Sequence, residues 1–239
     1  MAKEKTTAVV ESKEKVVEYT ANGEKIKLSP SMIRKYLVSG GGAVTDGEVM
    51  MFLSLCKYQH LNPFLKEAYL IKYGSSEPAT LVTAKDVFTK RADANPNYQG
   101  KKAGIMVLKK DGSIEEREGA MVLPDEKLVG GWAKVFVKDK EAEYQAVSFD
   151  EYAGKKKDGT LNSQWSKKPA TMIRKVAVVQ ALREAFPNTF QGLYIQEEMQ
   201  KISDVKLDVQ NVVAEEILQN ENTVEFVEPD EIIDGEVVE

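Results

Sequence analysis

Five cations lie on or just before a strongly apolar stretch, residues 164–187: Lys167, Lys168, Arg174, Lys175 and Arg183. A cation on a buried helix needs an anionic partner or a route for its charge to reach water. The nearby carboxylate of Glu184 cannot satisfy the three cations that project from the stretch. We therefore expect the missing anions to come from outside the protein, as phosphate groups would.

The stretch that carries these cations has the pattern of a buried helix. Pro169 can begin a helix, because its missing N–H would be unpaired at that position anyway. Pro187 ends the run because it cannot donate the next helical hydrogen bond. The apolar residues between the two prolines cover nearly the whole helical wheel, which predicts a deeply packed helix rather than a surface helix.

Other candidate binding residues lie in a loop and near a predicted hairpin. They are Lys155, Lys156 and Lys157, which lead toward the helix, Trp165 beside them, and Lys101, Lys102, Lys109 and Lys110 around the hairpin. Cations can follow a single-stranded backbone while aromatic rings stack on the bases. A plainer interpretation stays open, in which the lysines lie in solvated loops and Trp165 is a core residue.

The sequence carries no recognisable catalytic constellation. It lacks the G-x-x-x-x-G-K-[ST] phosphate loop and the G-x-S-x-G nucleophile elbow. His60 and Cys56 make only half of a zinc site, so we interpret both as packing residues. The acidic pairs Glu115-Glu116 and Asp150-Glu151 leave a metal-dependent nuclease as one alternative, and a protein-binding scaffold is another. We expect no catalytic residue and no metal ligand.

The net charge of −5 over 239 residues hides a strong asymmetry. Residues 201–239 hold 12 Asp and Glu against 2 Lys. The first 200 residues therefore carry 31 Lys and Arg against 26 Asp and Glu, so the body is mildly basic and the tail strongly acidic. Such an asymmetry points to a nucleic-acid partner, although a solubilising tail on an ordinary soluble protein is the competing interpretation.

Cysteine content and hydropathy indicate a cytoplasmic protein. A single cysteine excludes an internal disulfide framework and fits a reducing compartment. No apolar run reaches the roughly 18 residues of a membrane span. The first residues lack the apolar stretch of a signal peptide.

We expect three parts in the chain: an N-terminal arm over residues 1–30, a core over 31–200 and an acidic tail over 201–239. The arm has a turn signal at Asn22-Gly23, and we expect it to be flexible or ordered only against a neighbouring subunit. The tail alternates acidic and apolar residues and cannot bury enough apolar surface to fold alone, so we expect it to be disordered.

The core pattern predicts a meander of antiparallel strands between helices. Helices are expected from Pro30 and, through capping boxes, from Thr45 and Thr83. An Asp111-Gly112 hairpin is expected to use a type I′ turn. The other strands are expected at 67–73, 79–83, 132–137 and 144–149.

Several short motifs, spread over roughly residues 45–195, carry a family resemblance. The main one runs from Trp165 through a basic linker and Pro169 to Met-Ile-Arg-Lys, which ends at Lys175, and closes on Arg-Glu-Ala-Phe, which ends at Phe186. Supporting motifs are Leu61-Asn62-Pro63-Phe64, Lys90-Arg91-Ala92, Tyr98-Gln99-Gly100 and Gly131-Trp132-Ala133. Together they resemble the RecT/Redβ family of phage single-strand annealing proteins, and Arg174 matches the main motif best.

The resemblance implies both a fold and an activity. The fold would be α+β, with an antiparallel sheet and β-hairpin packed on a long central helix. The protein would anneal complementary single strands of DNA in the bacterial host cytoplasm, without ATP, as an oligomeric ring or helical filament. It would work beside a phage exonuclease and the host single-strand binding protein, and Mg²⁺ would influence annealing without a protein site.

Overall fold

The computed structural model describes residues 16–202 except 75, 76 and 157. The first half of the predicted arm therefore lies outside the described residues. So does the predicted acidic tail, apart from Lys201 and Ile202, which end a helix. None of the helices in this part of the chain is long and apolar enough to cross a membrane.

The chain begins its described part with a hairpin of β1 (Val17–Ala21) and β2 (Glu24–Leu28), which pair antiparallel. Asn22 and Gly23 both have positive φ, 53° and 81°, as a type I′ turn requires. The buried side chains of the hairpin are Tyr19, Ala21, Ile26 and Leu28. The Tyr19 hydroxyl donates to the Leu61 carbonyl at 2.7 Å. The prediction of a flexible arm is therefore wrong from Val17 onward, because this hairpin packs on its own chain.

A small sheet and a capped helix follow. Their elements are α1 (Pro30–Met32), a π-helical turn η1 (Ile33–Leu37), β3 (Val38–Ser39), α2 (Asp46–Tyr58), η2 (Pro63–Leu65), β4 (Ala68–Ile71) and β5 (Thr80–Thr83). β4 pairs parallel with β3 and antiparallel with β5, which confirms the two strands predicted in this region. The capping box of Thr45 with Glu48 is also confirmed.

The helix predicted to open at Thr83 is present as α3 (Lys85–Asp93), but its cap is not the predicted one. Ala84 is the N-cap residue and no side chain caps the helix. Thr83 is instead the last residue of β5, and its backbone N–H donates to the Tyr194 carbonyl at 2.9 Å. Thr83 also pairs with Ala68 of β4, so the end of β5 decides where this helix begins.

The second sheet is antiparallel, with strand order β7-β6-β8-β9. Its strands are β6 (Tyr98–Leu108), β7 (Ile114–Glu118), β8 (Lys127–Val137) and β9 (Glu143–Ser148). Between β6 and β7, Gly112 donates to the Lys109 carbonyl and is the one loop residue with positive φ. The prediction of a type I′ turn is wrong, because that turn needs positive φ at both central residues, and the loop has the longer form with a glycine bulge.

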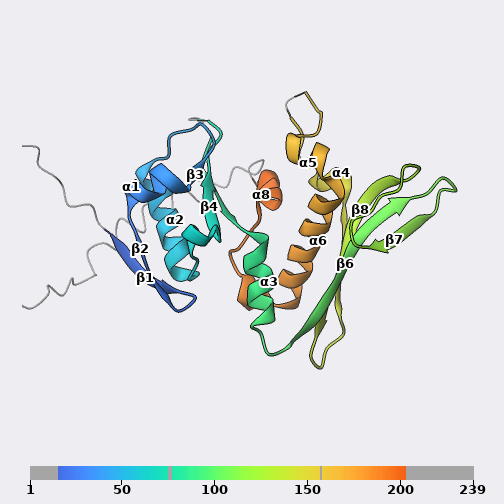
Figure 1. Ribbon diagram of the computed structural model, residues 1–239, viewed down its shortest axis with the longest axis horizontal. Helices are drawn as coiled ribbons and strands as arrows, with labels where there is room; N and C mark the ends of the chain where they lie inside the picture. Colours follow the sequence, from blue (N-terminus) through green and yellow to red (C-terminus); the bar gives the residue numbers. More distant parts are fainter. Residues whose placement is uncertain (1–15, 75–76, 157, 203–239) are drawn as a thin grey trace, which may run out of the picture. The chain divides into compact units, whose positions relative to one another are not determined.

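The remaining helices are α4 (Phe149–Tyr152), α5 (Ser163–Lys167), α6 (Pro169–Ala185), α7 (Pro187–Phe190) and α8 (Gln196–Ile202). α6 lies against one face of the second sheet, where it contacts β6, β8 and β9 (Figure 1). Its buried side chains are Ala170, Ile173, Val176, Ala177, Val178, Val179, Ala181 and Leu182. This confirms the deeply packed helix, and the α+β class with antiparallel strands is confirmed with it.

A glycine sets how closely α6 approaches the sheet. A Cβ added to Gly131 in β8 would lie 2.8 Å from the Ile173 carbonyl oxygen and 3.1 Å from the Arg174 nitrogen, both backbone atoms of α6. Any side chain at residue 131 would therefore push the helix away from the strand. The contact fixes the position of Arg174 relative to β8.

We expect Gly131→Ala to lower the free energy of unfolding by about 1–3 kcal/mol, because the added methyl group overpacks a contact between two backbones. Urea denaturation followed by circular dichroism measures this change. Gly47→Ala is the matched control, since a Cβ there meets nothing within 4 Å and alanine favours the helix. A Gly131→Ala protein as stable as the wild type would contradict the proposed constraint.

Glu48 ties α2 to the first sheet. Its carboxylate accepts from Lys72 Nζ at 2.8 Å, from the Thr45 N–H at 2.8 Å and from the Ala79 N–H at 2.7 Å. Lys72 is almost fully buried. Burial alone would raise the pKa of Glu48, but the hydrogen bonds from Lys72 and the two N–H groups outweigh it and hold the pKa below its ordinary value of 4.5.

This pKa shift predicts a pH-dependent stability. Because the pKa of Glu48 is lower in the folded chain, its contribution is present above pH 4.5 and is lost as the pH falls through the folded value. We expect Glu48→Gln to cost about 3 kcal/mol at neutral pH, since it breaks a buried pair, and less at acid pH. Urea titrations at several pH values measure this difference. Glu141→Gln, at an exposed loop position, should show no such trend.

Candidate nucleic-acid interface

The first candidate cations lie where α5 meets α6. Asn162 caps α5 by accepting from the N–H groups of Gln164 and Trp165, each at 3.1 Å. Lys167 is the last residue of α5, and Lys168 is both the C-cap residue of α5 and the N-cap residue of α6. Both lysines are exposed, and neither has a carboxylate within 4 Å in the described part of the chain.

Arg174 lies two turns further along α6 and is half-buried. Its Nε donates to the Ala103 carbonyl in β6 at 3.1 Å. Among the described residues it forms no ion pair, and its two terminal nitrogens form no hydrogen bond. One N–H therefore anchors the guanidinium to the sheet, and the terminal N–H groups are left for a ligand.

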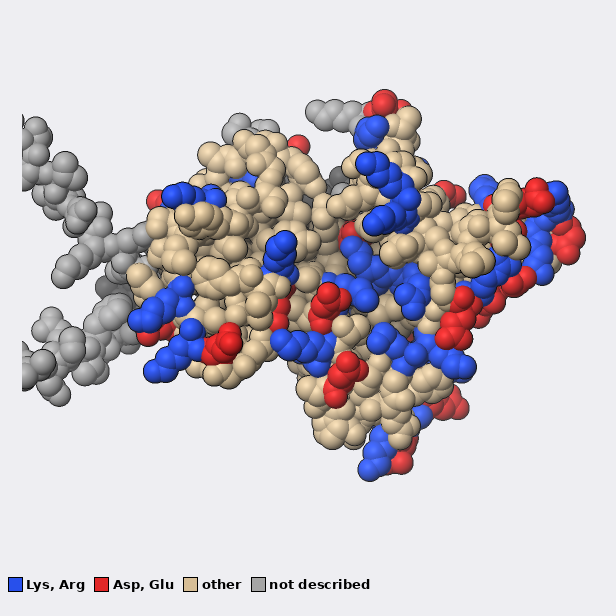
Figure 2. Space-filling model, in the orientation of Figure 1, with Lys and Arg blue, Asp and Glu red and all other residues tan. Residues whose placement is uncertain are grey.

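The cations of the preceding loop lie in the same region. Lys155 and Lys156 are exposed, and a turn at Asp158-Gly159 closes the loop through the Lys155–Leu161 bridge. Lys157 lies outside the described residues. Figure 2 shows Lys and Arg side chains gathered in a column over this loop, α5 and α6, with few acidic side chains among them.

Of the two lysines of β6, Lys101 continues this set. Lys101 is half-buried, with Nζ 3.3 Å from the Tyr98 hydroxyl and 5.9 Å from the centre of its ring. Lys102 is exposed and precedes Ala103, whose carbonyl holds Arg174. The structure thus brings Arg174 of α6 to β6 at Ala103, on the face where Lys101 lies. Lys102 lies on the opposite face of the sheet, because it pairs with the exposed Lys134.

Two of the predicted cations have partners inside the chain. Lys175 Nζ is 2.5 Å from Glu197, and Arg183 forms a bidentate pair with Glu198 at 2.9 and 2.6 Å. Glu197 and Glu198 are 3% and 7% exposed. The prediction that these cations lack anions within the protein is wrong, because α8 supplies both carboxylates. The sequence gives no short-range signal for this, since the partners are 22 and 15 residues apart.

The hairpin lysines are also neutralised locally. Lys109 pairs with Glu115 at 2.7 Å, and Lys110 pairs with Asp125 at 3.0 Å. The first pair is partly exposed and the second exposed, so both are weak and a ligand can compete with them. Like Lys175 and Arg183, these lysines therefore have a carboxylate in place.

Trp165 is a core residue. It is 1% exposed and packs edge-on against Phe149, with ring centres 5.6 Å apart. A ring this deeply buried cannot stack on a base, so the interpretation of Trp165 as a DNA-stacking residue is wrong.

The acidic pair Glu115-Glu116 lies in β7. No group of three His, Cys, Asp or Glu among the described residues could hold a metal ion. Glu115 is engaged by Lys109 and Arg117, and Glu116 accepts from the Tyr144 hydroxyl. These contacts remove the pair Glu115-Glu116 as a free acidic centre.

The residues predicted as packing residues differ in outcome. Cys56 is fully buried, and burial raises the pKa of its thiol to about 12. His60 is exposed beyond the end of α2, with φ 48° and Nδ1 2.9 Å from the Thr20 carbonyl. The packing interpretation is therefore wrong for His60.

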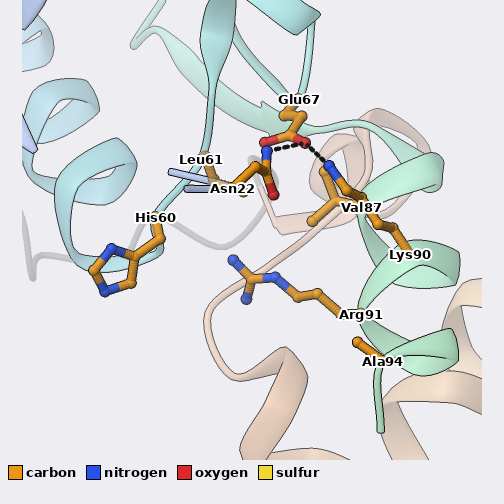
Figure 3. Close-up of a pocket in the computed structure, with 8 residues that line it drawn as sticks. All are labelled: Asn22, His60, Leu61, Glu67, Val87, Lys90, Arg91 and Ala94. Carbon is orange, nitrogen blue, oxygen red and sulfur yellow. Dashed lines mark hydrogen bonds and ion pairs between the residues drawn. The ribbon is translucent and has the colours of Figure 1, made fainter. Parts of the chain in front are cut away.

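A pocket of about 160 Å³ lies beside His60 and is lined also by Glu67, Lys90 and Arg91 (Figure 3). The charged side chains that line it form hydrogen bonds with each other or with backbone carbonyls. Lys90 donates to Glu67 at 3.0 Å, and the Arg91 guanidinium donates to the Gln59 carbonyl. These contacts join α3 to the loops around it, so we interpret the pocket as structural.

Comparison with known proteins identifies the family of the chain. A family model described as the RecT family matches residues 24–210. The matched range contains α5, α6, both sheets of the core and α8. No curated protein matches the chain.

We expect Arg183→Ala to lower the free energy of unfolding by about 3 kcal/mol, because it leaves the buried carboxylate of Glu198 without its partner. Urea denaturation measures the change. Glu184→Ala is the control on the same helix, and as an exposed position it should change stability by less than about 0.5 kcal/mol. If Arg183→Ala weakened DNA binding without changing stability, the structural role given to this pair would be wrong.

Proposed function

The chain belongs to the RecT family of single-strand annealing recombination proteins, and from this premise we propose that it binds single-stranded DNA through the unpaired cations around α6 and anneals complementary strands. As a RecT-type annealing protein it is not an enzyme. The binding residues we propose are Lys155, Lys156, Lys167, Lys168, Arg174 and Lys101.

The observation that carries this proposal is the difference between paired and unpaired cations. Lys175 and Arg183 have carboxylates from α8, whereas Lys167, Lys168 and Arg174 have none in the described part of the chain. The unpaired cations lie close together from the end of α5 to β6. A phosphate backbone supplies anions at a regular spacing along such a surface.

Electrostatics also accounts for annealing without a nucleotide. Two DNA strands repel each other through their phosphates, and a cationic surface neutralises that repulsion and releases counterions. We propose that no ATP is used and that Mg²⁺ acts on the DNA rather than at a protein site. Pairing of the bases then supplies the sequence specificity, while the protein contacts only the backbone.

One subunit offers few cations, so we propose that the protein works as an oligomer, a ring or a helical filament. Linked copies raise the effective concentration of each weak contact along one strand. The setting we propose is a bacteriophage or prophage recombination system in the bacterial cytoplasm. Its partners there would be a phage exonuclease and the host single-strand binding protein.

We expect Arg174→Ala to weaken binding of fluorescein-labelled oligothymidylate and to flatten the slope of log K against log salt by about one unit, as for the loss of one phosphate contact. Fluorescence anisotropy over a range of salt concentrations measures both. Lys168→Ala should act in the same way, and its exposed position makes it a test that does not disturb the fold.

The matched control is Lys110→Ala, because Lys110 is paired with Asp125 away from the α6 cations. It should change the salt slope by clearly less than Arg174→Ala. If both α6 variants fold and keep the wild-type slope, the cations around α6 do not bind DNA and the proposed site is wrong.

A further inference from the structure

The face of the second sheet that turns away from α6 has a regular surface pattern. Along β8, Ala133, Val135 and Val137 are buried, so the alternate residues Trp132, Lys134 and Phe136 lie on the opposite face. Figure 1 shows α6 on one side of this sheet. Cations and aromatic rings thus alternate along the outward face of β8, and Lys134 Nζ is 6.0 Å from the centre of the Phe136 ring.

Two lysines face each other at the centre of this surface. Lys102 in β6 is directly opposite Lys134 in β8, and both are exposed. Neither has a carboxylate within 4 Å in the described part of the chain. Like charges directly opposite on neighbouring strands are destabilising, so the pair favours an external anion.

An exposed aromatic ring lies next to the lysine pair. Tyr144 in β9 is directly opposite Lys134, is 42% exposed and stacks on Trp132 with ring centres 6.4 Å apart and planes 21° apart. Its hydroxyl donates to Glu116, which fixes the ring across the sheet. The arrangement leaves Tyr144 as the outer ring of a stack whose inner ring, Trp132, is buried.

A glycine makes room for the stack. A Cβ at Gly104, the β6 residue opposite Trp132, would lie 2.7 Å from Trp132 Nε1. The indole nitrogen is buried and has no hydrogen-bond partner among the described residues. The Trp132 ring therefore packs directly on the backbone of β6, and the Tyr144 ring stacks on it.

We propose that this outward face is a second binding site for single-stranded nucleic acid. Tyr144 and Phe136 offer ring faces to bases, and Lys102 and Lys134 hold the phosphates between them. Interleaved cations and exposed rings suit a single strand, because a duplex keeps its base faces covered.

The acidic side chains of the same face set its limits. Glu116 and Glu118 in β7 are exposed on this side of the sheet, opposite Met106 and Gly104. Their carboxylates repel phosphates, so the bound nucleic-acid strand lies over β8, β9 and the first half of β6. The site therefore has one basic half and one acidic edge.

The inference rests on the proposed function and extends it. The α6 cations and this face lie on opposite sides of one sheet, so a subunit could hold one strand on each side without bringing their phosphates together. Such a subunit could capture a second strand while the first stays bound, which is what annealing requires before bases can pair.

The test is a stoichiometric titration of the full chain with oligothymidylate at low salt, followed by anisotropy and by tryptophan fluorescence. The wild type should bind in two phases, and the weaker phase should quench fluorescence because Trp132 lies under the site. Tyr144→Leu should weaken only this phase by about tenfold, as for the loss of one stacked base. Lys134→Glu should abolish it.

Lys140→Glu is the charge-matched control, since Lys140 is exposed in the turn between β8 and β9 and lies outside the pattern. It should leave both phases unchanged. Arg174→Ala should weaken the tight phase and spare the weak one, and unfolding curves confirm that each variant is folded.

Three results would overturn the inference. A single phase in the wild type would leave the α6 site standing and remove the second one. Equal competition by polyglutamate, with Tyr144→Leu unchanged, would mean a general anion surface that serves acidic peptides instead. No DNA binding at all would overturn the proposed function together with this inference.

Discussion

The contact between the backbone of α6 and the backbone of β8 at Gly131 is the constraint on which the rest of the structure depends. Because no side chain separates them, the helix lies directly on the sheet, and its apolar residues fill the core all around. At this depth, the Arg174 side chain can reach the edge of β6 and bond to the Ala103 carbonyl. The cations of α5 and α6 and Lys101 of β6 thereby lie on the same side of the sheet, although about 70 residues separate Arg174 from Ala103 in the chain.

The cations of α5 and α6 form two groups with different roles. Lys175 and Arg183 face α8, where the buried carboxylates of Glu197 and Glu198 would be costly to leave unpaired, so the two cations pair with them. Lys167 and Lys168 lie at the exposed start of the helix, where water screens an unpaired charge and an unpaired cation costs little. The α8 pairs therefore hold the helix in place, and the exposed cations are left available for an external anion.

Much of this fold could be predicted from local patterns, and less of the site could. Prolines, capping residues and alternation predict the α6 helix, the Thr45 cap of α2, β4 and β5, and the strands of the second sheet. They did not predict β3, which has two residues. The partners of Lys175 and Arg183 could not be predicted, because a pattern along the chain says nothing about which carboxylate comes near. The prediction that Trp165 stacks on DNA bases was wrong for the same reason. The sequence shows an aromatic residue beside cations, and only the packing shows that this residue is buried. The hydrogen bond from Tyr19 to the Leu61 carbonyl could not be predicted either, because the two residues are 42 positions apart.

The second sheet shows why a surface can be informative even where its residues are ordinary. An exposed sheet face selected only for stability would set opposite charges across strands, as Lys109 and Glu115 do near the hairpin. Lys102 and Lys134 instead lie directly opposite each other. Beside them, the Tyr144 ring stacks on Trp132, and its hydroxyl donates to Glu116. A like-charge pair of this kind lowers stability slightly in the free protein and becomes favourable once an anion lies between the two ammonium groups. The same reasoning applies to the cations around α6, so both sides of the sheet carry charge that only a ligand can balance.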